Sequence, residues 1–129
     1  MLESLDFIYV PTGDVDAAAA HHQRVLGAEL LWKVRAMGTT VAALRISVGG
    51  PQILLSGHLA GERPILVYRV ADYQAAVATL RANGLTEIDE LEIPHGPCAV
   101  FRLDGGQRYA IYQLIRPNAD EHFAGRFDE

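Results

Sequence analysis

Five histidines and one cysteine are the first side chains to consider for metal binding or nucleophilic chemistry. His21 and His22 are neighbours in a stretch with helical periodicity, which suggests a metal site. Adjacent residues of a helix, however, point about 100° apart and do not face each other. We therefore expect a structural role for this pair, with His22 on the buried side of the helix and His21 near solvent.

His95 and Cys98 lie in residues 93–98, IPHGPC. An imidazole and a thiol this close could form a nucleophilic pair, but such a pair needs a third group that orients the base, and none is in view in the sequence. The two prolines and the glycine favour a turn instead. Because Cys98 is the only cysteine, an intrachain disulfide and a thiolate metal cluster are excluded.

The overall charge and hydropathy limit the classes of partner. The formal net charge is −5 and no run of Lys or Arg occurs, whereas nucleic-acid-binding proteins usually carry a basic patch. The longest apolar stretches have the length of strands, and the N-terminus lacks a basic segment followed by an apolar one. We therefore expect a cytoplasmic protein that binds neither nucleic acid nor a membrane.

One structural unit occurs twice, and it must position any functional side chain. Residues 7–27 and 64–84 each read as a strand, an aspartate at a helix start, an amphipathic helix and a closing glycine. Asp14 and Asp72 are suited to cap helices, and Gly27 and Gly84 can adopt the left-handed conformation that ends them. The spacing in the first helix predicts a buried stripe of Val15, Ala18, Ala19, His22, Val25 and Leu26.

Three strands are expected after each helix. Turn residues separate strand-like runs at residues 28–37, 41–48 and 52–56 in the first unit, and at 87–93, 98–103 and 108–115 in the second. The sequence thus predicts one α+β domain, with module one at residues 4–57, module two at 64–115 and a polar tail at 116–129. Phe123 and Phe127 of the tail are expected to dock on the body or on a second subunit.

Three short stretches carry a resemblance to a known family. They are VLG at residues 25–27, YRVADYQAAVATLRANG at 68–84 and LDGGQRYAIYQ at 103–113. Together with the repeated order of elements, they resemble the vicinal oxygen chelate superfamily, which includes glyoxalase I, bleomycin resistance proteins and extradiol dioxygenases. The resemblance implies two βαβββ modules whose curved mixed sheets form a cleft, often completed by a second subunit, and hence a homodimer.

Metal-dependent members of this superfamily hold one divalent ion with side chains from the first and last strand of each module. By position, the resemblance places these ligands at Phe7, Leu54, Ile65 and Ala110. None of the four has the imidazole or carboxylate donor that such ions need. We therefore expect neither a metal ion nor another cofactor.

If these positions face the cleft, the alternation of side chains along each strand brings their second neighbours to the same face. The expected ligand-binding residues are Phe7, Tyr9, Trp32, Arg45, Leu54, Ile65, Val67, Arg69, Val100, Arg102, Arg108, Ala110 and Tyr112. Trp32 could equally lie in a dimer interface. Gln52, Ala43 and Ser56 share this face, while Ile8, Val10, Leu66, Tyr68, Val70 and Ile111 are expected to pack under the helices.

A cleft of aromatic and aliphatic side chains with a few arginines suits a flat, largely apolar ligand with polar edges. We therefore expect a metal-independent binding protein that sequesters an aromatic or polycyclic small molecule such as an antibiotic, without catalytic residues. The alternative is a cofactor-free isomerase, lyase or cyclase, in which tyrosines, arginines, Asp6 or His95 serve acid–base chemistry. A structural module whose cleft is filled by its own side chains is a third possibility.

Overall fold

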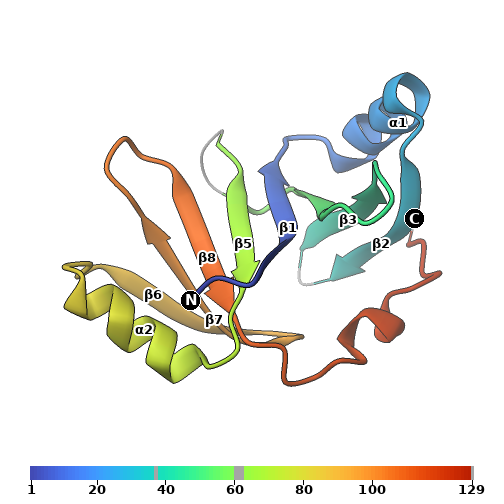
Figure 1. Ribbon diagram of the computed structural model, residues 1–129. Coiled ribbons are helices and arrows are strands. Elements are labelled where there is room, and N and C mark those ends of the chain that lie inside the picture. The colour runs from blue at the N-terminus through green and yellow to red at the C-terminus, as the bar shows by residue number, and fades with distance from the viewer. Residues whose placement is uncertain (37, 60–62, 129) are drawn as a thin grey trace.

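The computed structural model describes residues 1–36, 38–59 and 63–128. In this part of the chain two strand–helix–three-strand modules follow each other (Figure 1), so the predicted α+β fold is confirmed. The strands are β1 (Ser4–Pro11), β2 (Glu29–Ala36), β3 (Thr39–Arg45), β4 (Gln52–Ser56), β5 (Ile65–Arg69), β6 (Ile88–Ile93), β7 (Gly96–Arg102) and β8 (Arg108–Tyr112). The helices are α1 (Val15–Leu26), α2 (Tyr73–Ala82) and the short 3-10 helix η1 (Ala119–His122).

Both α-helices begin where the sequence predicts. The carboxylate of Asp14 accepts a hydrogen bond from the Ala17 amide at 3.0 Å, and that of Asp72 accepts one from the Ala75 amide at 3.0 Å. Such a cap stabilises a helix by about 1 kcal/mol relative to alanine. Helix α1 ends at Gly27, whose φ of 66° is left-handed. No helix in the described part of the chain is both long and apolar enough to cross a membrane.

All the strands belong to one sheet in the order β2-β3-β4-β1-β5-β8-β7-β6. Within each module the last strand pairs in parallel with the first, β4 with β1 and β8 with β5. The modules join through the antiparallel pairing of β1 with β5, in which Phe7 lies opposite Val67. A central row therefore runs across the sheet from Gln52 through Phe7 and Val67 to Ala110.

The two α-helices pack on one face of the sheet, and we call the other face the inner face. Val15 and Ala19 of α1 contribute to one hydrophobic cluster and Tyr73 of α2 to another. A third cluster lies on the inner face and draws on both modules. Its buried members are Phe7, Trp32, Ala43, Leu54, Ile65, Val67, Cys98, Ala110 and Tyr112. The inner face is therefore where the expected cleft must be sought.

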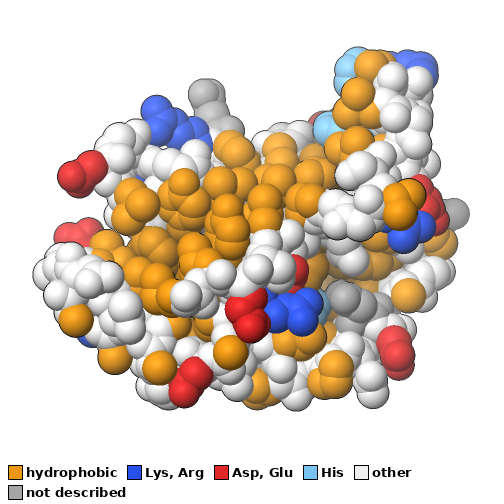
Figure 2. Space-filling model, in the orientation of Figure 1, with side chains coloured by type: hydrophobic (Ala, Val, Ile, Leu, Met, Phe, Trp, Pro, Cys, Tyr) orange, Lys and Arg blue, Asp and Glu red, His pale blue; other side chains and the backbone are white. Residues whose placement is uncertain are grey.

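The helices cover less of the sheet than the sequence predicts. Val10, Val70 and Ile111 pack under them, but Ile8, Leu66 and Tyr68 stay half-buried outside both helix clusters. Figure 2 shows hydrophobic side chains gathered over β8, β5 and β1. Val25 and Leu26 are 61% and 55% exposed, so the predicted stripe of α1 is wrong in its last turn, which stands clear of the sheet (Figure 1). The homodimer expected from the resemblance stays a prediction.

Candidate functional site

The inner face is hollowed by two adjoining cavities of different polarity. The polar cavity has a volume of about 290 Å³ and the apolar recess one of about 150 Å³. Strands β1, β5 and β8 each contribute to both, because residues two apart on a strand share a face. Phe7, Arg69 and Tyr112 line the polar cavity, and Tyr9, Val67 and Ala110 line the apolar recess.

Asp6 is the charged centre of the polar cavity. The pairing of β1 with β5 shifts by one residue between Leu5 and Phe7, and this bulge leaves Asp6 as the extra residue. A bulge can redirect a side chain from the face that strict alternation gives it, and Asp6 lines the same cavity as Phe7. Strict alternation puts the two residues on opposite faces, which is why Asp6 is missing from the ligand-binding residues expected from the sequence.

Three donors hold the carboxylate of Asp6. Arg69 Nε donates to Oδ2 at 2.8 Å, Ser4 Oγ donates to Oδ1 at 2.7 Å, and the Tyr112 hydroxyl also donates to Oδ2. Burial raises the pKa of the Asp6 carboxyl, but these hydrogen bonds outweigh it, so the pKa lies below its ordinary value of 3.8. Burial and the hydrogen bond to Asp6 raise the pKa of Tyr112. At neutral pH the cluster is therefore a carboxylate, a guanidinium and an uncharged phenol.

His95 lines the polar cavity beside this cluster. It lies in the turn between β6 and β7, and its carbonyl oxygen accepts hydrogen bonds from the amides of Ile115 and Arg116, each at 3.0 Å. The residue is 9% exposed, and its ring centroid lies 5.0 Å from that of Phe7 and 5.9 Å from that of Tyr112. The turn predicted from the sequence is present, and it places an imidazole at the cavity.

Gly96 allows the turn that carries His95 to approach the chain after β8. A Cβ at this position would lie 2.1 Å from the carbonyl oxygen of Gln113, a backbone atom with little freedom to move. We expect Gly96→Ala to lower the free energy of unfolding by about 1–3 kcal/mol, as overpacking does, in urea unfolding. Gly13→Ala is the control, because a Cβ at Gly13 meets nothing within 4 Å. Equal losses in the two variants would contradict this explanation.

Gln52 lines the polar cavity from β4. Its Oε1 is buried and has no hydrogen-bond partner in the described part of the chain. An acceptor left open at a cavity can receive a hydrogen bond from a ligand group, so Gln52 supports the assignment of this cavity as the site.

Solved structures are similar to this fold over most of its length, although no family model and no curated protein matches the sequence. Methylmalonyl-CoA epimerase from Mycobacterium tuberculosis is 19% identical with a TM-score of 0.73, covering 92% of this chain and 93% of that one. A variant of the Streptomyces coelicolor enzyme in complex with 2-nitronate-propionyl-CoA is 18% identical, with a TM-score of 0.72 and coverages of 90% and 97%. A hypothetical protein from Bacillus halodurans C-125 is 17% identical, with a TM-score of 0.71 and coverages of 85% and 93%.

The chain has the vicinal oxygen chelate fold. The fold implied by the resemblance of residues 25–27, 68–84 and 103–113 is thereby confirmed. Because one fold hosts many activities, what this protein does must be argued from the site.

The neighbours contradict the hypothesis of a protein that sequesters an aromatic or polycyclic antibiotic. Those named above with an activity are epimerases, which are enzymes, so the alternative of an enzyme fits them better than sequestration does. The inner face agrees, because the apolar recess of about 150 Å³ is smaller than the roughly 300–1,000 Å³ of typical ligand pockets. The polar cavity beside it contains the charged groups of Asp6 and Arg69 together with Phe7 and Tyr112.

The positions that hold the metal in metal-dependent members of the vicinal oxygen chelate fold do not fit an ion here. Those inferred from the sequence are Phe7, Leu54, Ile65 and Ala110, and all four lie in the inner-face cluster, each at most 6% exposed. Hydrocarbon side chains cannot coordinate a divalent cation. Among the described residues, no group of three or more His, Cys, Asp or Glu could hold one.

The structure brings most of the predicted ligand-binding residues to the two cavities. Phe7, Arg69 and Tyr112 line the polar cavity, whereas Tyr9, Ile65, Val67, Val100 and Ala110 line the apolar recess. Leu54 and Trp32 belong to the inner-face cluster but line neither cavity. The described residues that line the two cavities thus come from all the strands except β2 and β3.

Arg45, Arg102 and Arg108 line neither cavity. Each is the first or last residue of a strand and therefore lies at the rim of the sheet. Arg45 pairs with Glu29, and Arg108 donates to the carbonyl oxygen of Arg63 at 2.9 Å.

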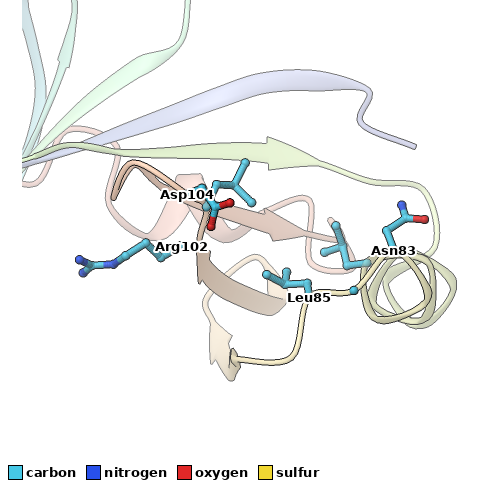
Figure 3. Close-up of a pocket in the computed structure, with 7 residues that line it drawn as sticks. Asn83, Leu85, Arg102 and Asp104 are labelled. Carbon is cyan, nitrogen blue, oxygen red and sulfur yellow. The ribbon is translucent and has the colours of Figure 1, made fainter.

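Arg102 lies instead at a surface pocket of about 510 Å³ between the end of α2 and the β7–β8 hairpin. Figure 3 shows its guanidinium pointing away from Leu85. The described residues that line this pocket include no buried titratable side chain. The larger pocket is therefore a weaker candidate for chemistry than the polar cavity.

Proposed function

We propose that the protein is a cofactor-independent enzyme, an isomerase or lyase that moves a proton on the carbon atom next to a carbonyl group of a small anionic compound. The observation that carries this proposal is the buried imidazole of His95 at a cavity whose other polar groups include Arg69, Asp6 and Tyr112. Removal of such a proton needs a base within reach and a group that stabilises negative charge on oxygen.

His95 is the proposed base. Asp6 is poorly suited, because its three donors lower its pKa and hold it as a carboxylate. Tyr112 keeps its proton, because burial and the hydrogen bond to Asp6 raise its pKa. Imidazole is the side chain that most often accepts and returns protons at neutral pH. The C–H electron pair then moves toward the carbonyl oxygen. His95 can return its proton to the same face of the carbon; if solvent delivers a proton to the opposite face instead, His95 releases its own proton to solvent and the carbon is inverted.

Arg69 is proposed to bind the substrate oxygen that becomes negative. Its guanidinium keeps its charge throughout the physiological range, and its Nε is fixed on Asp6 at 2.8 Å. Asp6 and Tyr112 therefore serve to position the cation before the substrate arrives. Preorganised charge of this kind is often the largest single contribution to catalysis.

The two cavities suggest the shape of the substrate. Its carbonyl and anionic groups belong in the polar cavity with Arg69, and a short hydrocarbon substituent belongs in the apolar recess lined by Val67, Val100 and Ala110. A branched acid or a branched acyl thioester combines such polar groups with a short hydrocarbon substituent. Methylmalonyl-CoA is the first probe, because the epimerases with this fold are named for it.

Deuterium exchange tests the proposal. The protein is stripped of metal with EDTA and incubated in D₂O with methylmalonyl-CoA, methylmalonate and a series of branched acyl thioesters. We expect deuterium at the α-carbon by mass spectrometry, at a rate that EDTA does not change. Exchange that stops in EDTA and returns with a divalent metal would refute cofactor independence. Absence of both exchange and calorimetric binding across the series would refute the enzyme proposal.

A further inference from the structure

The end of the chain forms a strap along the free edge of the sheet. We call residues 119–128 the C-terminal strap. The Lys33 amide in edge strand β2 donates to the carbonyl oxygen of Arg126 at 2.8 Å, and the Asp128 amide donates to the carbonyl oxygen of Lys33 at 2.8 Å. The Arg35 amide donates to Asp128 Oδ2 at 2.9 Å. In Figure 1 the chain that follows β8 leads into the strap, which ends beside β2, so the strap ties module two to the outer strand of module one.

The strap also covers part of the inner face. Phe123 packs against the inner-face cluster, and its ring centroid lies 5.1 Å from that of Trp32. Trp32 is only 8% exposed. Neither cavity is lined by a described residue of β2 or β3, although Trp32 and Ala43 of these strands lie on the inner face. Phe123 therefore occupies the position in which the sequence led us to expect ligand beside Trp32.

We propose that the C-terminal strap determines which ligands the inner face accepts, by covering the part of it that β2 and β3 provide. With the strap in place, only a compact ligand that fits the polar cavity and the small apolar recess can bind. With the strap displaced, Trp32 and its apolar neighbours Val34, Val41 and Ala43 form a surface for an aromatic ring or a longer hydrocarbon chain. This inference concerns access to the inner face and holds whichever reaction takes place there.

Phe123 is the anchor that can be tested against a matched residue of the same segment. Phe127 is also a strap phenylalanine, but it is 53% exposed. Because Trp32 is the only tryptophan, its fluorescence reports directly whether the C-terminal strap covers it. We expect Phe123→Ala to raise acrylamide quenching of Trp32 and binding of the dye anilinonaphthalene sulfonate several-fold, with an unchanged far-ultraviolet circular dichroism spectrum. Phe127→Ala should stay near the wild type.

If Phe123→Ala showed the same quenching and dye binding as the wild type, the proposal would be overturned. Equal increases in Phe123→Ala and Phe127→Ala would also overturn it, because they would indicate a general loosening of the fold. If Phe123→Ala does not fold, Asp128→Ala decides, because it removes the acceptor of the Arg35 amide without altering the inner-face cluster. Increased Trp32 quenching in that variant supports the strap, and unchanged quenching refutes it. These measurements need no turnover, so failure of the exchange assay would leave their result intact.

Discussion

Replacement of His95 by glutamine is expected to slow α-proton exchange by about 10²–10⁴-fold, the usual contribution of a general base, with little change in KM. Glutamine can hydrogen-bond like an imidazole, but its amide cannot take up a proton. It can also fill the space beside Phe7 and Tyr112, whose rings contact that of His95. Initial rates of deuterium incorporation measure the effect, and circular dichroism checks the fold.

His21→Gln is the control for this substitution. His21 is exposed on α1 and contacts Arg24 at 3.0 Å, away from both cavities, so this variant should exchange at the wild-type rate. A His95→Ala variant rescued in part by free imidazole would assign the loss to proton transfer instead of folding. A His95→Gln variant that exchanges as fast as the wild type would show that another group is the base.

Local signals in the sequence were sufficient to predict the elements and the face that carries the site. Asp14 and Asp72 cap their helices through contacts three residues away, so their own short segments contain the information. Alternation along a strand is equally local, and it correctly placed Phe7 and Ile65 on one face. The repetition of the unit then predicted two modules.

The groups that give the site its polarity depend on contacts between distant parts of the chain. The bulge at Asp6 exists only in the pairing of β1 with β5, and no pattern within β1 indicates it. Prolines and glycine predicted the turn at His95, but only the packing of this turn against the chain after β8 makes the imidazole line a cavity. Phe123 likewise contacts Trp32, although the two residues are far apart in the sequence. Alternation and turn chemistry cannot supply these partners.

The second large effect is expected at Asp6. Asparagine has nearly the same shape, but its amide nitrogen cannot accept a hydrogen bond, so at least one of the donors Arg69, Ser4 and Tyr112 loses its partner. Loss of a half-buried charged acceptor of this kind should lower the free energy of unfolding by about 1–2 kcal/mol. Turnover should fall by about 10²-fold, because a small displacement of Arg69 misplaces the charge that binds the substrate. Urea unfolding and the exchange assay measure the two effects.

The stability effect of Asp6→Asn should also depend on pH in a definite direction. The folded-state pKa of Asp6 lies below its ordinary value of 3.8, so the wild type holds this stabilisation above the ordinary pKa and loses it as the pH falls through the folded-state pKa. The difference in the free energy of unfolding between wild type and variant should therefore be complete at neutral pH and shrink in acid.

Asp16→Asn is the control. Like Asp6, Asp16 is an ion-paired aspartate, but its partners are Lys33 and Arg35 and its side chain is 49% exposed. Its smaller effect should vanish at high salt. If the loss of stability in Asp6→Asn also vanished at high salt, or if it persisted fully in acid, Asp6 would form only surface ion pairs and would not organise the cavity.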